Sequence, residues 1–178
     1  MDIRLLDRNH RAEVTGLFKA VFTASAGSEE GNLLAGLVAE LAANIDNEQI
    51  ICVGAYDYEA LIAAIFFTRL DCHESVLIHM LAPVAVSTGH QGKGVGQGLI
   101  KYGLDLLKNR AVDAVITYGD PAFYSQVGFH SITESQLKAP QTLSMPQGWL
   151  GQSLTSAPIP TIEQRPTCVP AFNDPAYW

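Results

Sequence analysis

A run of glycines in the middle of the chain holds the residue types best suited to chemistry. Glycine stands at every second position from 92 to 98, with Lys93 among them, between an apolar run and a pattern typical of a helix. Glycine lacks a Cβ, so another group can approach its backbone closely. The N–H groups at a helix start have no partner within the helix and, with the helix dipole, attract anions. The stretch predicts a phosphate-binding loop; the alternative is a tight glycine turn that binds nothing.

Two well-known phosphate-binding motifs do not fit this loop. The P-loop motif requires Ser or Thr after its lysine, whereas Lys93 is followed by Gly94. The dinucleotide motif GxGxxG also fails, because a motif started at Gly92 ends on Gln97 and one started at Gly94 ends on Leu99. A nucleotide-binding switch is therefore disfavoured.

The N-terminal half shows the patterns of a strand, two helices and a run of strands that precede the loop. Asp7 or Asn9 can cap the first helix and Ser28 the second, because their side chains accept bonds from free N–H groups. The small, polar stretch 23–27 is interpreted as the break between the helices, and Asn44 as the end of the second. We predict a strand at 3–6, helices with apolar stripes at 14–21 and 33–41, and strands at 50–56, 60–70 and 75–86.

Pro83 interrupts the last of these strands. A proline removes a donor from the strand ladder and is tolerated mainly at a bulge or an edge. After the loop, the pattern predicts a helix around 99–107, a buried strand at 114–118 and a short helix at 122–127 that starts near Pro121 and stops at Gly128.

The last part of the chain is rich in proline and weakly patterned. We expect an irregular C-terminal arm from about residue 140, with strands near 141–145 and 160–165. Four aromatic residues are expected to hold this arm to the body: Trp149, Phe172, Tyr177 and Trp178.

Composition predicts a single globular domain spanning 1–178. Of the 178 residues, 48% are hydrophobic and 16% charged, which favours a packed α+β or α/β domain with one central sheet. The net charge of −7 disfavours a nucleic-acid partner and suits a cationic one. No apolar run is long enough for a membrane span and no signal peptide is indicated, so we expect a cytoplasmic protein. The three cysteines show no zinc-ligand spacing, and Cys52 is expected in the core.

Two motifs together resemble a known family. Gln91-x-x-Gly94-x-Gly96, after a strand and at a helix start, resembles the cofactor motif Q/R-x-x-G-x-G/A of the GNAT family of acetyl-CoA-dependent N-acetyltransferases. The segment 119–129, in which Tyr124 precedes a Gly-Phe pair, is similar to the family's later motif. With the segment 81–86, these motifs are similar to the YhbS-like bacterial branch. The resemblance covers roughly residues 76–132.

The resemblance implies the fold and the site residues. The fold would be a layered α/β/α domain of the α+β class, whose mixed central sheet is splayed at the strand ending Val84–Val86. Tyr124 would be the general acid beside the cofactor's sulfur; the alternative is a packed helix tyrosine. The strand backbone would bind the pantetheine arm and offer an oxyanion donor, and the loop would bind the diphosphate. The implied cofactor-binding residues are Val84, Ala85, Val86, Gln91, Gly92, Lys93, Gly94, Val95, Gly96, Gln97 and Tyr124.

The general base is not identified by the sequence. Family members often carry a glutamate on the strand leading to the cofactor slot, and no acidic residue lies between 76 and 86. His79 lies on that strand, but a histidine in an apolar strand is more often a core residue. Glu29 and Glu30 fit a helix start, and Asp120 fits a helix cap, so none of the four is assigned as the base.

The resemblance implies an enzyme that moves an acetyl group from acetyl-CoA to a primary amine by direct attack. Two alternatives stay open: a CoA-binding regulatory or interaction module without turnover, and an acyltransferase that uses another acyl-CoA. The sequence does not identify the amine acceptor, which the acidic net charge suits as a cationic small molecule or peptide. It also leaves the oligomeric state open, a homodimer included.

Overall fold

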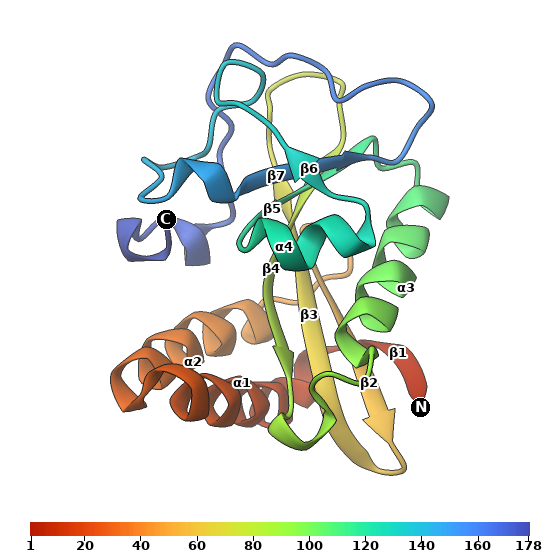
Figure 1. Cartoon of the computed structure of the whole chain (residues 1–178), viewed down its shortest axis with the longest axis vertical. Coiled ribbons are helices and arrows are strands. Elements are labelled where there is room, and N and C mark those ends of the chain that lie inside the picture. The colour runs from red at the N-terminus through yellow and green to blue at the C-terminus, as the bar shows by residue number, and fades with distance from the viewer. The chain divides into compact units, whose positions relative to one another are not determined.

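The computed structural model describes residues 1–178 and contains seven strands and four α-helices, joined by turns and short 3-10 helices (Figure 1). The sequence patterns described above account for most of these elements. In chain order they are β1 (Asp2–Leu6), α1 (Arg11–Ala26), α2 (Ser28–Ala43), β2 (Ile50–Asp57), β3 (Ala60–Leu70), β4 (Ile78–Val86), α3 (Val95–Asn109), β5 (Ala114–Tyr118), α4 (Pro121–Tyr124), β6 (His130–Ser131) and β7 (Trp149–Ser153).

The strands form a mixed sheet in the order β1-β2-β3-β4-β5-β7-β6. β1 runs antiparallel to β2, β4 runs parallel to β5, and β7 is antiparallel to both β5 and β6. The connection from β4 to β5 passes through α3, as a parallel pair requires. The prediction of an α+β fold with a mixed central sheet is confirmed.

The chain divides into two compact units, of which the first comprises Met1–Phe67 and Pro83–Tyr102. Within it α1 and α2 lie side by side (Figure 1). The apolar stripes predicted for these helices are buried, as Phe18, Leu37 and Leu41 show with exposed fractions of 0%, 2% and 0%. The predicted core position of Cys52 is also confirmed, since its side chain on β2 is fully buried.

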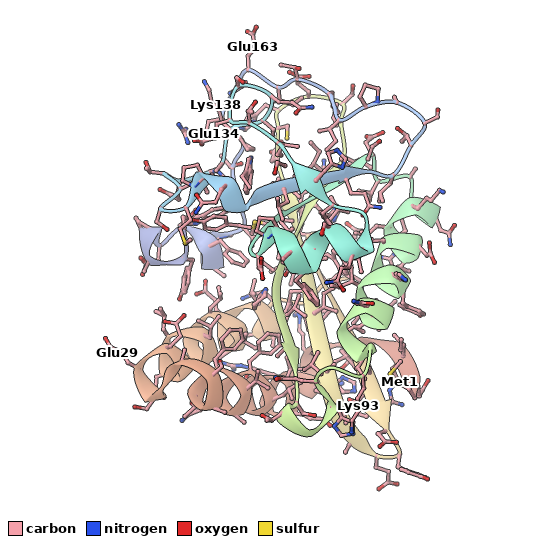
Figure 2. All side chains as sticks on the ribbon, viewed as in Figure 1. Met1, Glu29, Lys93, Glu134, Lys138 and Glu163 are labelled. Atoms are coloured by element: carbon pink, nitrogen blue, oxygen red, sulfur yellow. The ribbon has the colours of Figure 1, made fainter.

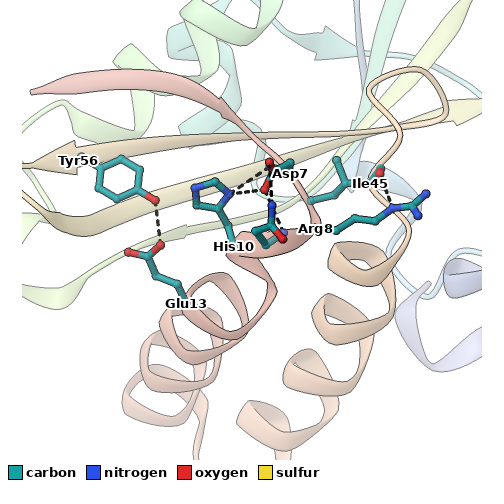
Figure 3. A network of polar contacts seen from close by, with 7 residues as sticks. Asp7, Arg8, His10, Glu13, Ile45 and Tyr56 are labelled. Carbon is teal, nitrogen blue, oxygen red and sulfur yellow. Dashed lines mark hydrogen bonds and ion pairs between the residues drawn. The ribbon is translucent and has the colours of Figure 1, made fainter.

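A polar network connects the start of α1 to β2 and to the end of α2 (Figure 3). Asp7 caps a short 3-10 helix, Arg8–His10, that precedes α1, and His10 completes a reciprocal capping box. The Arg8 Nε donates to the Ile45 carbonyl at 2.9 Å, and the Tyr56 hydroxyl donates to Glu13 Oε2 at 2.9 Å. These bonds attach the start of α1 to β2 and to the segment that follows α2.

The second unit comprises Thr68–Ala82 and Gly103–Trp178. Asp113 sets its register: its Oδ2 accepts from Leu77 N at 2.8 Å, and its own N–H donates to the Leu77 carbonyl at 2.8 Å. Immediately after this link, β4 and β5 pair in parallel. The other edge of β5 pairs with β7, so β5 is enclosed on both sides and its first four residues are fully buried.

The C-terminal arm is part of this second unit. Phe172 and Trp178 are buried, Tyr177 is half-buried, and Trp178 Nε1 donates to the Phe172 carbonyl at 2.8 Å. The prediction that these three aromatic residues hold the arm is confirmed. The prediction also holds for Trp149, which begins β7, is buried and lies near Trp178, with ring centroids 6.3 Å apart.

Three sequence predictions are wrong. Ser28 does not cap α2: it is the first helical residue, and Gly27, with φ of +93°, takes the cap position without a side-chain bond. Residues 23–26 are helical and extend α1, so the break between the helices is the single residue Gly27. The strands expected at 141–145 and 160–165 do not form, since only the single bridge between Leu137 and Ile162 reaches that region. The free edge of β5 is paired by Trp149–Ser153 instead.

Candidate active site

The backbone of the glycine loop between β4 and α3 is not covered by side chains at its glycines. Gly92 and Gly94 have φ of +71° and +79°, the left-handed region that residues with a Cβ seldom adopt. A Cβ built at Gly89, Gly92 or Gly94 would meet no heavy atom within 4 Å. The loop therefore uses glycine for its backbone conformation and leaves its outer surface open to a ligand.

Three side-chain bonds hold the loop in this conformation. Gln91 Nε2 donates to the Val86 carbonyl at 2.9 Å, so the first residue of the motif ties the loop to the end of β4. The Lys93 ammonium donates to the Gly89 carbonyl at 2.8 Å and is exposed at the loop (Figure 2). Ser87 Oγ and His90 Nδ1 lie 2.8 Å apart within the same turn. The loop is thus ordered by its own side chains and carries one positive charge.

The start of α3 adds backbone N–H groups to the loop. The first hydrogen bond of the helix runs from Gly98 N to the Gly94 carbonyl at 2.9 Å. The N–H groups of the preceding turn, at Val95 and Gly96, accordingly have no carbonyl partner within the helix. Together with the helix dipole they favour a phosphate group at this point.

The pairing and the burial of β4, the strand before the loop, change along its length. Ile78–Leu81 of β4 pair with Ala114–Thr117 of β5, and this ladder ends before Pro83. Residues 78–81 are buried, whereas Ala82, Pro83 and Val84 are half-exposed and Ala85 is buried again. A strand segment beyond its ladder has backbone groups that an extended ligand chain can use.

Thr117 closes the ladder in the second unit. Its hydroxyl donates to the Leu81 carbonyl at 2.8 Å, and its side chain is fully buried. The sequence analysis did not single out Thr117. The one signal that could have found it is a polar residue within the apolar run that precedes Gly119.

Tyr124 is held in a fixed orientation in the same unit. Its ring packs edge-on against Phe123 and Phe129, with centroid separations of 5.0 Å and 5.7 Å. A Cβ at Gly119 would lie 2.6 Å from Tyr124 Cε2, and the Tyr124 and Thr117 side chains are hydrogen-bonded. Burial raises the pKa of Tyr124, against a smaller lowering from the bond to Thr117. The phenol is thus protonated at neutral pH, as a general acid requires.

The four residues considered as a base lie in different surroundings. His79 is buried on β4, with 5% of its surface exposed. Asp120 caps α4 by accepting from Ala122 N at 2.9 Å, as expected from the sequence. Glu29 is exposed and Glu30 is half-exposed in the first turn of α2. Two of the four, His79 and Asp120, belong to the unit that contains Tyr124.

Comparison with protein families gives one match that decides the family. Residues 14–129 match the model of the acetyltransferase (GNAT) family. The chain belongs to this family. The match includes β4, the glycine loop, α3 and Tyr124, which are the elements described above.

Individual GNAT relatives agree with this assignment. The chain is 30% identical to the uncharacterized N-acetyltransferase YjhQ of Escherichia coli strain K12 over 139 residues. The aligned region covers 74% of each protein. The crystal structure of the YhbS N-acetyltransferase of Escherichia coli in complex with CoA superposes with a TM-score of 0.83, at 24% identity over 97% of this chain and 92% of that one. The structure of a GNAT acetyltransferase of Brucella melitensis in complex with acetyl-CoA superposes with a TM-score of 0.68, at 20% identity over 97% of both chains.

None of the helices of this chain has both the length and the apolar character needed to cross a membrane.

Proposed function

We propose that this GNAT protein is an acetyl-CoA-dependent N-acetyltransferase that acts on a primary amine. The observation that carries the proposal is the open glycine loop at the start of α3. Gly92 and Gly94 are left-handed there, and a Cβ built on either would meet no heavy atom within 4 Å. Family membership and the CoA and acetyl-CoA complexes of the YhbS and Brucella melitensis proteins support it.

In this proposal the first unit binds the donor. The N–H groups from Gln91 to Gln97 bind the diphosphate, and Lys93 adds a charge. The backbone of Val84, Ala85 and Val86 binds the amides of the pantetheine arm, and one N–H there stabilises the oxyanion. Gln91 acts mainly through its bond to the Val86 carbonyl, which joins these two groups of donors. Acetyl-CoA supplies the acetyl thioester.

Tyr124 is proposed to supply the proton that the leaving sulfur requires. The amine nitrogen bonds to the acetyl carbon, the carbon–sulfur bond breaks, and the sulfur takes the Tyr124 proton. The nitrogen releases one proton to water, and Tyr124 regains one from water. In the overall reaction an amine and a thioester become an amide and a thiol. Its raised pKa keeps Tyr124 protonated until this step.

Ligand binding and turnover, measured in parallel, test this function. Calorimetry of the whole protein is expected to show binding of CoA and acetyl-CoA and none of ATP at the same concentration. Thiol release from acetyl-CoA is then followed over a panel of primary amines. Binding of ATP in place of CoA contradicts the cofactor assignment. Binding of CoA with no thiol release from acetyl-CoA or from propionyl-CoA supports a CoA-binding module instead, and release from propionyl-CoA alone assigns another acyl donor.

A further inference from the structure

A pocket of about 560 Å³ lies within the second unit, where β5 ends and α4 begins. Its walls come from three parts of the chain: residues 118–121, the turn 144–148, and the end of the arm at 176–178. Two of these three parts belong to the C-terminal arm, for which the sequence analysis found no role. The volume is in the range of small-molecule sites, roughly 300–1,000 Å³.

The lining has one charged side chain and three aromatic rings. Asp120 provides the charged side chain, and Tyr118, Tyr177 and Trp178 provide the rings. No Lys, Arg or His lines the pocket. Asp120 Oδ1 accepts the cap bond from Ala122 N, which leaves Oδ2 to accept from a ligand. A carboxylate beside aromatic faces favours a cation with an apolar body.

The pocket walls are fixed before any ligand binds. The Tyr118 hydroxyl accepts from Met145 N at 2.7 Å and is hydrogen-bonded to Ser144 Oγ at 3.0 Å. Gly119 N donates to the Gly148 carbonyl at 3.0 Å. The rings of Tyr118 and Trp178 are stacked within 16° of parallel, with centroids 6.4 Å apart. A preformed pocket needs little ordering on binding, which favours a specific small ligand.

Gly119 connects this pocket to Tyr124. It lines the pocket, and its α-carbon lies against the Tyr124 ring, so that a Cβ there would meet Tyr124 Cε2 at 2.6 Å. One residue thus separates the pocket from the ring proposed to act on the leaving sulfur. Resting on the proposed function, we infer that this pocket is the acceptor site and that it takes a small primary amine with an aromatic or alkyl body.

In this site Asp120 binds the ammonium form of the acceptor and the three rings contact its body. The ammonium group releases one proton to water before attack, and the free amine then reacts as described above. Asp120 is therefore a binding residue for the acceptor and keeps its structural role as the cap of α4.

Calorimetry with the intact protein and defined probes tests this inference. 2-Phenylethylamine is expected to bind, whereas 2-phenylethanol, which lacks the charge, binds at least about tenfold more weakly. Asp120→Asn keeps an N-cap oxygen but removes the charge. It is expected to lower the affinity for 2-phenylethylamine about tenfold while leaving the affinity for CoA unchanged. Asp7→Asn is the matched control, because Asp7 also caps a short helix but belongs to the first unit.

A second variant tests the pocket without using its charge. Ala176 is exposed and lines the pocket, so Ala176→Phe is expected to fill the space and abolish 2-phenylethylamine binding without unfolding the protein. Equal binding of the alcohol and the amine, unchanged affinity in both variants, or no amine binding up to about 10 mM overturns the inference. Tighter binding of the peptide Phe-Gly-Gly-amide than of 2-phenylethylamine also overturns it and assigns a peptide acceptor. CoA binding in the same samples separates these outcomes from failure of the proposed function.

Discussion

The ring of Tyr124 packs directly on the backbone of Gly119, so closely that a Cβ on Gly119 would lie 2.6 Å from Tyr124 Cε2. Two further rings, of Phe123 and Phe129, contact it edge-on. The position of the phenol therefore depends on the absence of a side chain at one residue of the β5–α4 turn.

Gly119→Ala is expected to displace the Tyr124 ring and lower kcat about tenfold or more, because a small misplacement of a reacting group is costly. CoA affinity, measured by calorimetry, should be unchanged. Gly36→Ala is the control: it lies in α2, a Cβ there meets nothing within 4 Å, and alanine favours the helix. A Gly119→Ala protein with full kcat would contradict the packing argument.

Tyr124→Phe removes the acidic proton and keeps the ring. We expect kcat to fall about a hundredfold, the scale of general acid catalysis, with the Kd for CoA within about twofold of the original. Steady-state kinetics and calorimetry on the same preparation measure both quantities. If kcat and CoA affinity fell by the same factor, Tyr124 would be a binding residue and its role as acid would be rejected.

The pH dependence of kcat follows from the raised pKa of Tyr124. Burial raises this pKa, and an acid works only while it holds its proton. At saturating acetyl-CoA and amine, kcat should therefore show no decline up to pH of about 10, the ordinary value for a phenol. The measurement compares kcat from pH 7 to 10.5, with the uncatalysed hydrolysis of the thioester subtracted. A decline centred near pH 8 or 9 would point to another acid.

Gly94→Ala forces a residue with a Cβ into a φ of +79° and places that Cβ where the loop is otherwise open. We expect the Kd for CoA to rise about tenfold or more, because the free loop relaxes out of a conformation whose strain costs about 1–3 kcal/mol and CoA binding must restore it. Gly89→Ala is the matched control in the same loop, because Gly89 does not have a positive φ and a Cβ there also meets nothing within 4 Å. Equal CoA affinity in both variants would remove the loop from the binding site.

Asp46 makes the stability of the first unit depend on pH. Burial acts to raise its pKa, but the N–H groups of Ile50, Glu48 and Gln49, at 2.8–3.0 Å from Oδ1, hold the pKa below its ordinary value. Asp46→Ala should lower the free energy of unfolding by roughly 1 kcal/mol at pH 7, and Asp46→Asn by less, since the amide oxygen still accepts.

The sign of this pH effect is fixed by the direction of the shift. A carboxyl whose folded pKa is lowered stabilises the fold above its unfolded pKa of about 4 and loses that contribution as pH falls through the folded value. Urea unfolding at pH 7 and at pH 3 should therefore show a smaller difference between the original protein and Asp46→Ala at pH 3. A difference that grows toward low pH would contradict the assignment.

Local patterns were enough to predict much of the fold. Continuous apolar runs predicted β2, β3 and β5, and the glycines predicted the loop between β4 and α3. In contrast, β7 was missed. Its middle residue is Gly151, which weakens a strand pattern, yet a Cβ there would lie 2.7 Å from Ile159 Cδ1 and 3.0 Å from Ile116 Cδ1. The glycine is required by contacts that only the folded chain creates.

The candidate site also has one part that local sequence patterns predict and one part that only the folded chain shows. The glycine loop and Tyr124 belong to motifs of consecutive residues, so their sequence alone indicated a role. The pocket beside Gly119 could not be predicted, because Tyr118, Met145 and Trp178 are far apart in the chain and meet only through hydrogen bonds and ring stacking. Residues 144–148 and 176–178 have no pattern of their own that marks a binding wall.

The position of β7 beside β5 has a consequence for how the protein is made. The family match stops at residue 129, whereas β5 finds its second partner only at residues 149–153. A nascent chain released at residue 129 would expose one edge of a buried strand, which is a template for aggregation. β7 must therefore be synthesised before this edge of β5 is covered, so the segment that carries the family signature leaves the sheet incomplete.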